Sequence, residues 1–179
     1  MEQMNQAYKV FTRICLNNWH YIDRKVLGLN ESINFFTGHS GSGKSTVIDA
    51  MQIVLYANTD GRGFFNKAAA DDSDRSLIEY LRGMINIGEN NQAEYKRNKN
   101  FSTTIVLEME QTITKEKECI GVVFDVETAT NEINRLFFWH KGELIPGDYR
   151  TESRAMTISE VRSYLQQNFP KDEMFYTSN

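Results

Sequence analysis

The feature that most constrains this chain of 179 residues is the stretch GHSGSGKS at residues 38–45. It matches G-x-x-x-x-G-K-[ST] at every fixed position and separates the apolar run SINFFTG from a segment with helical periodicity. Glycines at this spacing let backbone N–H groups turn toward phosphate oxygens, and the N-terminus of the next helix favours negative charge. The stretch therefore predicts a phosphate-binding loop between a buried strand over 32–38 and a helix that starts near Lys44.

The motif predicts a role for each polar residue at the start of that helix. Lys44 can reach the β- and γ-phosphates, the Ser45 hydroxyl can ligate Mg²⁺, and Thr46 can bond the α-phosphate. The predicted nucleotide contacts are Gly38, His39, Ser40, Gly41, Ser42, Gly43, Lys44, Ser45 and Thr46. The motif alone leaves kinases, GTPases, transporter ATPases and chromosome ATPases as alternatives.

The N-terminal part combines strand-like and helical patterns. Residues 8–17 alternate like a strand, 18–29 hold a turn and a second short strand, and 86–100 are polar enough for a surface loop. The apolar face predicted for the helix from Ser45 consists of Val47, Ile48, Met51, Val54 and Leu55. A second helix within 71–85 is predicted to bury Leu77, Ile78, Leu81 and Ile85.

The C-terminal part has a different pattern. Three strand-like runs over 101–112, 117–128 and 133–144 are joined by short polar turns, which favour an antiparallel meander. A helix over 157–168 follows, and Thr157 with Glu160 fits a capping box. The order of elements is not the regular strand–helix alternation of a doubly wound sheet.

Composition excludes several classes of protein. A net charge of −4 and a pI near 5.5 argue against a freestanding nucleic-acid binder, so any DNA contact has to come from a local patch. No apolar run is long enough for a membrane helix, and the N-terminus lacks the apolar core of a signal peptide. Cys15 and Cys119 are expected to be reduced, buried and structural, which indicates the cytoplasm.

The segment GVVFDVE, residues 121–127, resembles the acidic strand that holds Mg²⁺ in ATP-hydrolysing proteins. ABC-type hydrolases place the catalytic glutamate directly after the aspartate, but here Val126 separates Asp125 from Glu127. The segment also lies among the antiparallel runs, where alternation reflects the two faces of a strand. We expect Asp125 to be structural. The chain contains no LSGGQ-like signature, and its three histidines are too scattered for a zinc site.

The stretch LNNWHYIDRKVLGLNESINFFTGHSGSGKSTVIDAMQIVLYA, with its Asn18-Trp19 and Asp49-Ala50 pairs, resembles the opening of SMC-like ATPases. This group includes condensin-type proteins and double-strand-break repair ATPases. The following FFNKAAADDSDRSLIEYLRGMI is similar to the ATPase subunit of the Wadjet anti-plasmid system, a bacterial condensin-like complex. The resemblance covers residues 10–90 well and continues more loosely beyond them.

The resemblance implies an α/β fold of the P-loop NTPase class. It would be the N-terminal lobe of an ABC/SMC-type head, with an antiparallel β subdomain beside the P-loop strand and helix. Residues 1–179 would form this single lobe. Its parts are strands, P-loop and first helix over 8–60, a helix and basic loop over 61–100, antiparallel strands over 101–145, and a helix over 156–168.

The resemblance also implies cofactors and partners. ATP and Mg²⁺ would bind here, whereas a C-terminal lobe beyond a long coiled coil would supply the hydrolytic residues. This chain would therefore bind ATP without turnover, and it would hold no catalytic residue of its own. Implied partners are that lobe and coiled coil, a second ATPase head, kleisin-type and accessory subunits, and DNA, with no membrane. The bacterial cytoplasm, with association to the nucleoid, is the expected location.

Carried over by position, several further residues become candidates. His20 and Tyr21 fall where family members contact the base or ribose, although a packed aromatic turn is the alternative. Arg62 falls where an arginine lies near phosphates or DNA. Lys96, Arg97 and Lys99 form a basic loop flanked by aromatic residues, which could contact DNA phosphates. For these four basic residues the alternative is a solvated loop.

Two other functions remain open at this stage. A freestanding P-loop kinase would need an acceptor site and an arginine-rich lid, and neither is recognisable in the sequence. A module that binds nucleotide without hydrolysing it would need nothing beyond the loop. Intrinsic ATPase activity of the single chain would favour a complete enzyme.

Overall fold

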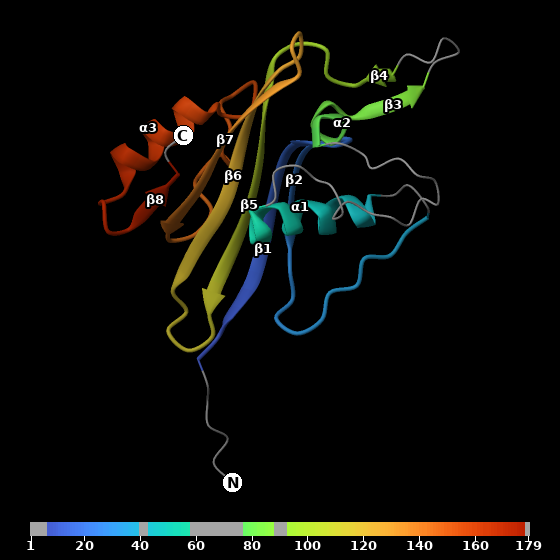
Figure 1. Ribbon diagram of the computed structural model, residues 1–179. Coiled ribbons are helices and arrows are strands. Elements are labelled where there is room, and N and C mark those ends of the chain that lie inside the picture. Colours follow the sequence, from blue (N-terminus) through green and yellow to red (C-terminus); the bar gives the residue numbers. More distant parts are fainter. Residues whose placement is uncertain (1–6, 40–42, 58–76, 88–92, 178–179) are drawn as a thin grey trace.

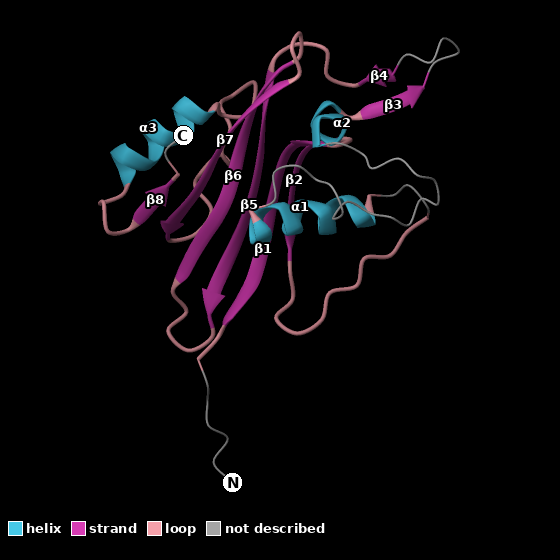
Figure 2. Ribbon diagram, viewed as in Figure 1, coloured by secondary structure: helices cyan, strands magenta, loops and turns pink. Residues whose placement is uncertain are grey.

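The computed structural model describes residues 7–39, 43–57, 77–87 and 93–177, and a six-stranded sheet forms its centre (Figures 1 and 2). The strands are β1 (Lys9–Trp19), β2 (Ile22–Gly28), β5 (Phe101–Gln111), β6 (Lys117–Glu127), β7 (Glu132–Lys141) and β8 (Met174–Tyr176). Their order across the sheet is β2-β1-β5-β6-β7-β8, and all neighbours are antiparallel. The predicted meander of β5, β6 and β7 is confirmed.

The central strands are apolar on both faces because both faces are covered. Along β5 and β6, Ile105 and Phe124 face one core, whereas Val106 and Val123 face the other. This alternation is the period of two that a strand imposes. A two-sided sheet with helices on opposite sides results, and it gives the expected α/β arrangement of an antiparallel sheet beside the P-loop helix (Figure 1).

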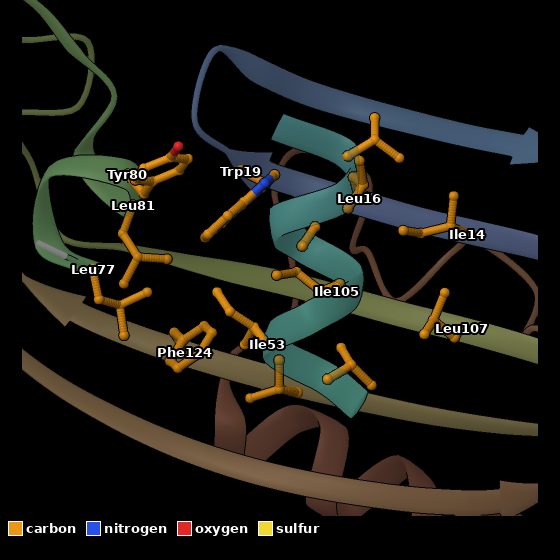
Figure 3. Close-up of a cluster of buried hydrophobic side chains, with 14 of the residues drawn as sticks. Ile14, Leu16, Trp19, Ile53, Leu77, Tyr80, Leu81, Ile105, Leu107 and Phe124 are labelled. Atoms are coloured by element: carbon orange, nitrogen blue, oxygen red, sulfur yellow. The ribbon is translucent and has the colours of Figure 1, made fainter. Parts of the chain in front are cut away.

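The helix α1 (Lys44–Tyr56) lies across one face of the sheet (Figure 3). Its inward residues Val47, Ala50 and Ile53 pack against side chains of β1, β5 and β6 in one buried cluster. Burial of each large aliphatic side chain contributes roughly 1.5–3 kcal/mol. The short α2 (Leu77–Arg82) extends the same cluster with Leu77, Tyr80 and Leu81.

The helix α3 (Ile158–Asn168) and the segment before it cover the opposite face. Ile158, Val161 and Leu165 turn toward the sheet. The predicted capping box is confirmed, because the Thr157 hydroxyl accepts a bond from the Glu160 amide while the Glu160 carboxylate accepts one from the Thr157 amide. The three-residue strand β8 after α3 was not predicted.

The predicted buried strand over 32–38 is wrong. Residues 33–38 form no strand, and Ile33 and Phe35 are 62% and 83% exposed. Asn34 instead bonds back to Asn30 through both of its amide atoms, which turns the chain locally. A buried strand needs neighbours in a sheet, and the described sheet ends at β2.

The outward face of α1 also differs from the prediction. Ile48 and Leu55 are each 45% exposed, whereas Thr46 and Asp49 are buried. Hydrogen bonds from Trp19 to the Thr46 carbonyl and from Tyr80 to Asp49 hold these two polar residues inward. Polar contacts therefore set which side of the helix faces the core.

The region 77–100 departs from prediction as well. The helix ends at Arg82 because Gly83 follows in a left-handed conformation, with φ of 65°. Met84–Ile87 then form β3, which pairs with β4 (Ala93–Tyr95), so part of the predicted loop is a hairpin. Ile85 lies in β3 and is exposed rather than on a helical face. None of the helices in the described part of the chain could cross a membrane.

Candidate functional site

The predicted phosphate loop meets α1 in a conformation that favours glycine. Gly43 has φ of 88° and stands directly before Lys44, the first residue of α1. Among the described residues no side-chain hydrogen bond caps this end of the helix, and the dipole of a helix start favours negative charge. Gly38, His39 and Gly43 are described here, whereas Ser40, Gly41 and Ser42 lie outside the described residues.

The ammonium group of Lys44 folds back over the loop. Its Nζ donates to the carbonyl oxygens of Gly38, at 2.7 Å, and His39, at 2.9 Å. These bonds hold the positive charge next to the loop. A phosphate that entered the loop would compete with the two carbonyls for the same donor.

The residues that follow Lys44 in α1 are held in place by a contact with β1. The indole Nε1 of Trp19 donates a 2.8 Å bond to the Thr46 carbonyl, which joins β1 to the first turn of the helix. Thr46 is buried and Ser45 is half-buried. The start of the helix is thereby attached to the end of β1, where the turn toward β2 begins.

A cleft of about 480 Å³ opens between these elements. Its lining residues are His20, Tyr21, Ile22, Lys25, Leu27, Phe35, Phe36, Thr37, Gly43, Lys44, Thr46 and Val47. The basic side chains among them come from His20, Lys25 and Lys44, and this described lining includes no carboxylate. A cavity of this size with cationic and aromatic walls suits an anion that carries a flat ring.

Two predicted contacts, His20 and Tyr21, lie in this cleft together with the end of the phosphate loop. Tyr21 is 46% exposed, whereas His20 is only 5% exposed. The His20 ring packs edge-on against Tyr21, with centroids 3.9 Å apart, and lies 4.8 Å from the Tyr80 ring. Tyr21 therefore offers accessible aromatic surface in the cleft, as does the exposed Phe35, and the buried His20 ring packs against Tyr21.

The P-loop helix is also tied to α2. The Tyr80 hydroxyl donates a 2.7 Å bond to Oδ2 of the buried Asp49. The Tyr80 ring stacks on Trp19, with centroids 5.2 Å apart, and Figure 3 shows the two rings side by side. The backbone amide of His20 donates to the Tyr80 carbonyl. Asp49 and Trp19, which belong to the two motif pairs, thus meet around one tyrosine.

The three basic residues of the predicted basic loop differ in their exposure and contacts. Lys99 is exposed, but Lys96 pairs with Asp23 and Arg97 is 9% exposed with its guanidinium turned into the protein. Hydrogen bonding to Lys96 is the main cause that lowers the pKa of Asp23, whereas burial lowers the pKa of Arg97. The expectation that Arg97 contacts DNA is corrected, because its donors already bind carbonyls of this chain. Arg62 lies outside the described residues.

Asp125 occupies a structural position, as expected. Its carboxylate accepts bonds from the Ser102 hydroxyl, at 2.7 Å, and from the Ile158 amide at the start of α3. It therefore lies on the side of the sheet that α3 covers, and α1 lies on the other. The described residues contain no group of three or more histidine, cysteine or acidic side chains that could hold a metal.

Both cysteines are buried and free, as expected, and burial raises the pKa of Cys15 and of Cys119 to about 12. Sequence reasoning missed Lys25, Phe35 and Phe36 as lining residues of the cleft. Lys25 could have been found, because alternation along β2 places it on the same face as Leu27, which packs on the α1 core.

Comparison with known families supports the loop assignment. Residues 11–72 match the family described as the P-loop-containing region of an AAA domain. This span includes most of β1, together with β2, the phosphate loop and α1. The chain contains an α/β P-loop fold. No curated protein matches it.

Among solved structures, one is described as "Structural biochemistry of ATP-driven dimerization and DNA stimulated activation of SMC ATPases". It is similar to this chain with a TM-score of 0.43 and 15% sequence identity, over 88% of this chain and 78% of that chain.

Proposed function

We propose that the chain is the ATP-binding N-terminal lobe of an SMC-like ATPase head. The observation that carries the proposal is the cleft that brings Lys44 and Thr46 into one cavity with Tyr21. A nucleotide needs both ends of this arrangement, namely a helix start with a lysine for its phosphates and an aromatic surface for its base. The sequence resemblance around Asn18-Trp19 and Asp49-Ala50 supports the same assignment.

Phosphates would bind at the loop and the first turn of α1. Backbone N–H groups of Gly41 and Gly43 would surround them, and Lys44 would exchange its two carbonyl partners for phosphate oxygens. The Ser45 hydroxyl would hold Mg²⁺, which supplies charge neutralisation at the phosphates when bound. Thr46, whose carbonyl Trp19 fixes, would contact the α-phosphate.

Hydrolysis would need groups from outside this lobe. The described lining of the cleft holds no carboxylate that could orient water, and Asp125 lies on the α3 side of the sheet. We therefore propose that a C-terminal lobe and a second head supply the catalytic residues. This chain by itself would bind ATP and release it unchanged.

Exposed apolar side chains in the segment before the loop and on α1 support a covering partner. Phe35 and Ile33 stand out from the segment before the loop, while Ile48, Leu55 and Tyr56 are exposed on α1. Large exposed apolar residues that gather near one site commonly mark an interface. In the proposed assembly a C-terminal lobe would pack here and give residues 33–37 the sheet neighbour that the described strands do not provide.

The wider proposal is a cytoplasmic bacterial machine that handles DNA. Chromosome organisation, repair and anti-plasmid defence are its candidate settings, and the Wadjet-like segment over 64–85 supports the last of them. Kleisin-type and accessory subunits and DNA would then be partners. Exposed Lys99, at the end of the basic loop, is the described residue of that loop best placed for DNA phosphates.

The test is ATP binding and ATP hydrolysis by the single chain in the same Mg²⁺ buffer, beside an Asp125→Asn variant. We expect saturable binding, turnover no higher than background, and no difference between the two proteins in either measurement. Turnover that Asp125→Asn abolishes would overturn the proposal and make 121–127 a working acidic motif. Transfer of phosphate to a small acceptor would instead identify a freestanding kinase.

A further inference from the structure

The turn between β1 and β2 is held in place by hydrogen bonds that side chains donate to its backbone carbonyls. Arg97 donates through Nη1 to the His20 carbonyl, at 2.7 Å, and through Nη2 to the Ile22 carbonyl, at 3.3 Å. Lys96 donates to the carbonyl between them, that of Tyr21, at 3.0 Å. Three consecutive carbonyls are therefore bound by two adjacent basic side chains that lie 75 or more positions away in the sequence.

Arg97 is buried at this position and makes further contacts there. Its guanidinium also donates to the Leu81 carbonyl at the end of α2 and pairs with Asp23, at 3.2 Å. Its side chain is only 8% exposed, and five donors in a fixed fork let it reach several acceptors at once. A lysine in its place could not span the same carbonyls.

The turn is under conformational strain that these contacts maintain. Asn18 and His20 have positive φ values of 54° and 50°, which non-glycine residues adopt at a cost. Gly83 lies very close to the same turn, because a Cβ atom at position 83 would be 2.8 Å from the His20 carbonyl oxygen. The Tyr21 hydroxyl donates to the Met84 carbonyl, at 2.6 Å, which fixes the ring next to the cleft.

We propose that Arg97 is a positioning residue for the nucleotide base, because it holds the His20–Ile22 backbone so that the Tyr21 ring forms a wall of the cleft. The inference rests on the proposed function and deepens it. Arg97 itself touches neither the base nor the phosphates. It acts through Tyr21, so its contribution depends on the presence of a base in the ligand.

The experiment measures dissociation constants for Mg²⁺-ATP and for tripolyphosphate, which has no base, by calorimetric titration. Arg97→Ala is expected to weaken ATP about tenfold, which is near the lower end of what one stacked base contributes. Tripolyphosphate, held by the loop alone, should change by less than about twofold. Arg24→Ala is the control, because Arg24 lies in β2 next to the turn but pairs with Asp148 instead of with the turn carbonyls.

A double-mutant cycle separates positioning from general stability. If Arg97 acts through Tyr21, Arg97→Ala should weaken ATP no further in a Tyr21→Ala background. Equal losses of affinity for ATP and tripolyphosphate, or additive losses in the cycle, would overturn the proposal.

If Arg97→Ala fails to fold by circular dichroism, the Asp23→Asn variant tests the proposal instead. Asp23 is exposed, and its replacement should weaken the binding of ATP but not of tripolyphosphate. If wild-type protein binds neither ligand, the proposed function fails; if it binds both equally, only this inference fails.

Discussion

The hydroxyl of Tyr80 donates a 2.7 Å hydrogen bond to the buried carboxylate of Asp49, which ties α2 to the inward face of the P-loop helix. Loss of one donor to a buried carboxylate costs about 1–3 kcal/mol. We therefore expect Tyr80→Phe to lower the free energy of unfolding by about this amount in urea denaturation. Tyr95→Phe, which keeps the stack under Arg82, is the control. Equal midpoints for the two variants would contradict the role of this bond.

Glu108 should make stability depend on pH. Its carboxylate is fully buried, which would raise its pKa, but hydrogen bonds from Arg13, the Leu144 amide and Thr12 outweigh burial and lower the pKa to about 2 from 4.5. A depressed folded-state pKa adds stability above the unfolded value, and this stability is lost as pH falls from about 4.5 toward 2.

Glu108→Gln should therefore be destabilised at pH 7, by about 3 kcal/mol, because it breaks a buried ion pair. The difference from wild type should shrink as pH falls below 4.5. Glu160→Gln is the control: the pKa of Glu160 is also about 2, owing mainly to its bond with Arg154, but that pair is exposed and contributes at most about 1 kcal/mol. A pH-independent difference for Glu108→Gln would contradict the prediction.

Gly83→Ala should lower the thermal stability of the protein, because Gly83 lies in close contact with the β1–β2 turn. Its φ of 65° is unfavourable for alanine, and the new Cβ would stand 2.8 Å from the His20 carbonyl oxygen. Gly142→Ala is a close match, because Gly142 has φ of 92° but nothing within 4 Å of its Cβ position. Strain alone costs about 1–2 kcal/mol in each, so a larger loss in Gly83→Ala measures the clash. Equal thermal stabilities would show that the corner relaxes freely.

The exposed side of α1 should promote self-association. Replacing Ile48 and Leu55 together by lysine removes apolar surface at positions 45% exposed, so the folded state should change by less than about 0.5 kcal/mol per site. Sedimentation velocity at high concentration should show less association than wild type. Lysine at the exposed α3 positions Ser163 and Gln167 adds the same charge elsewhere and should not have this effect. Identical behaviour of both double variants would point to net charge as the cause.

Local sequence patterns predicted much of the fold. The meander of β5–β7 and the capping box of α3 follow from alternation and from the Thr157–Glu160 spacing, both of which act over a few residues. The run at 32–38 was misassigned because an apolar segment becomes a strand only where a neighbour can bond to it. Ile48 and Leu55 were misassigned because Trp19 and Tyr80 fix the rotation of α1 through polar contacts that periodicity does not report.

The candidate site was predictable in part. The phosphate loop is a contiguous motif, so Lys44, Ser45 and Thr46 could be named from sequence. That Tyr21 shares a cleft with them, and that Arg97 is buried against the turn, depends on contacts between distant segments. The basic residues in 96–99 could equally belong to a solvated loop or be buried against the turn, and only the structure shows that Arg97 is buried.

The measurement that tests the central claim most directly is the affinity for Mg²⁺-ATP of wild-type protein and of Lys44→Ala, by calorimetric titration. Lys44 supplies charged hydrogen bonds worth about 1.5–3 kcal/mol each, so its loss should weaken binding at least about tenfold with unchanged circular dichroism. Lys99→Ala, at an exposed position of the basic loop, should bind like wild type. Unchanged ATP affinity in Lys44→Ala would contradict nucleotide binding at this loop.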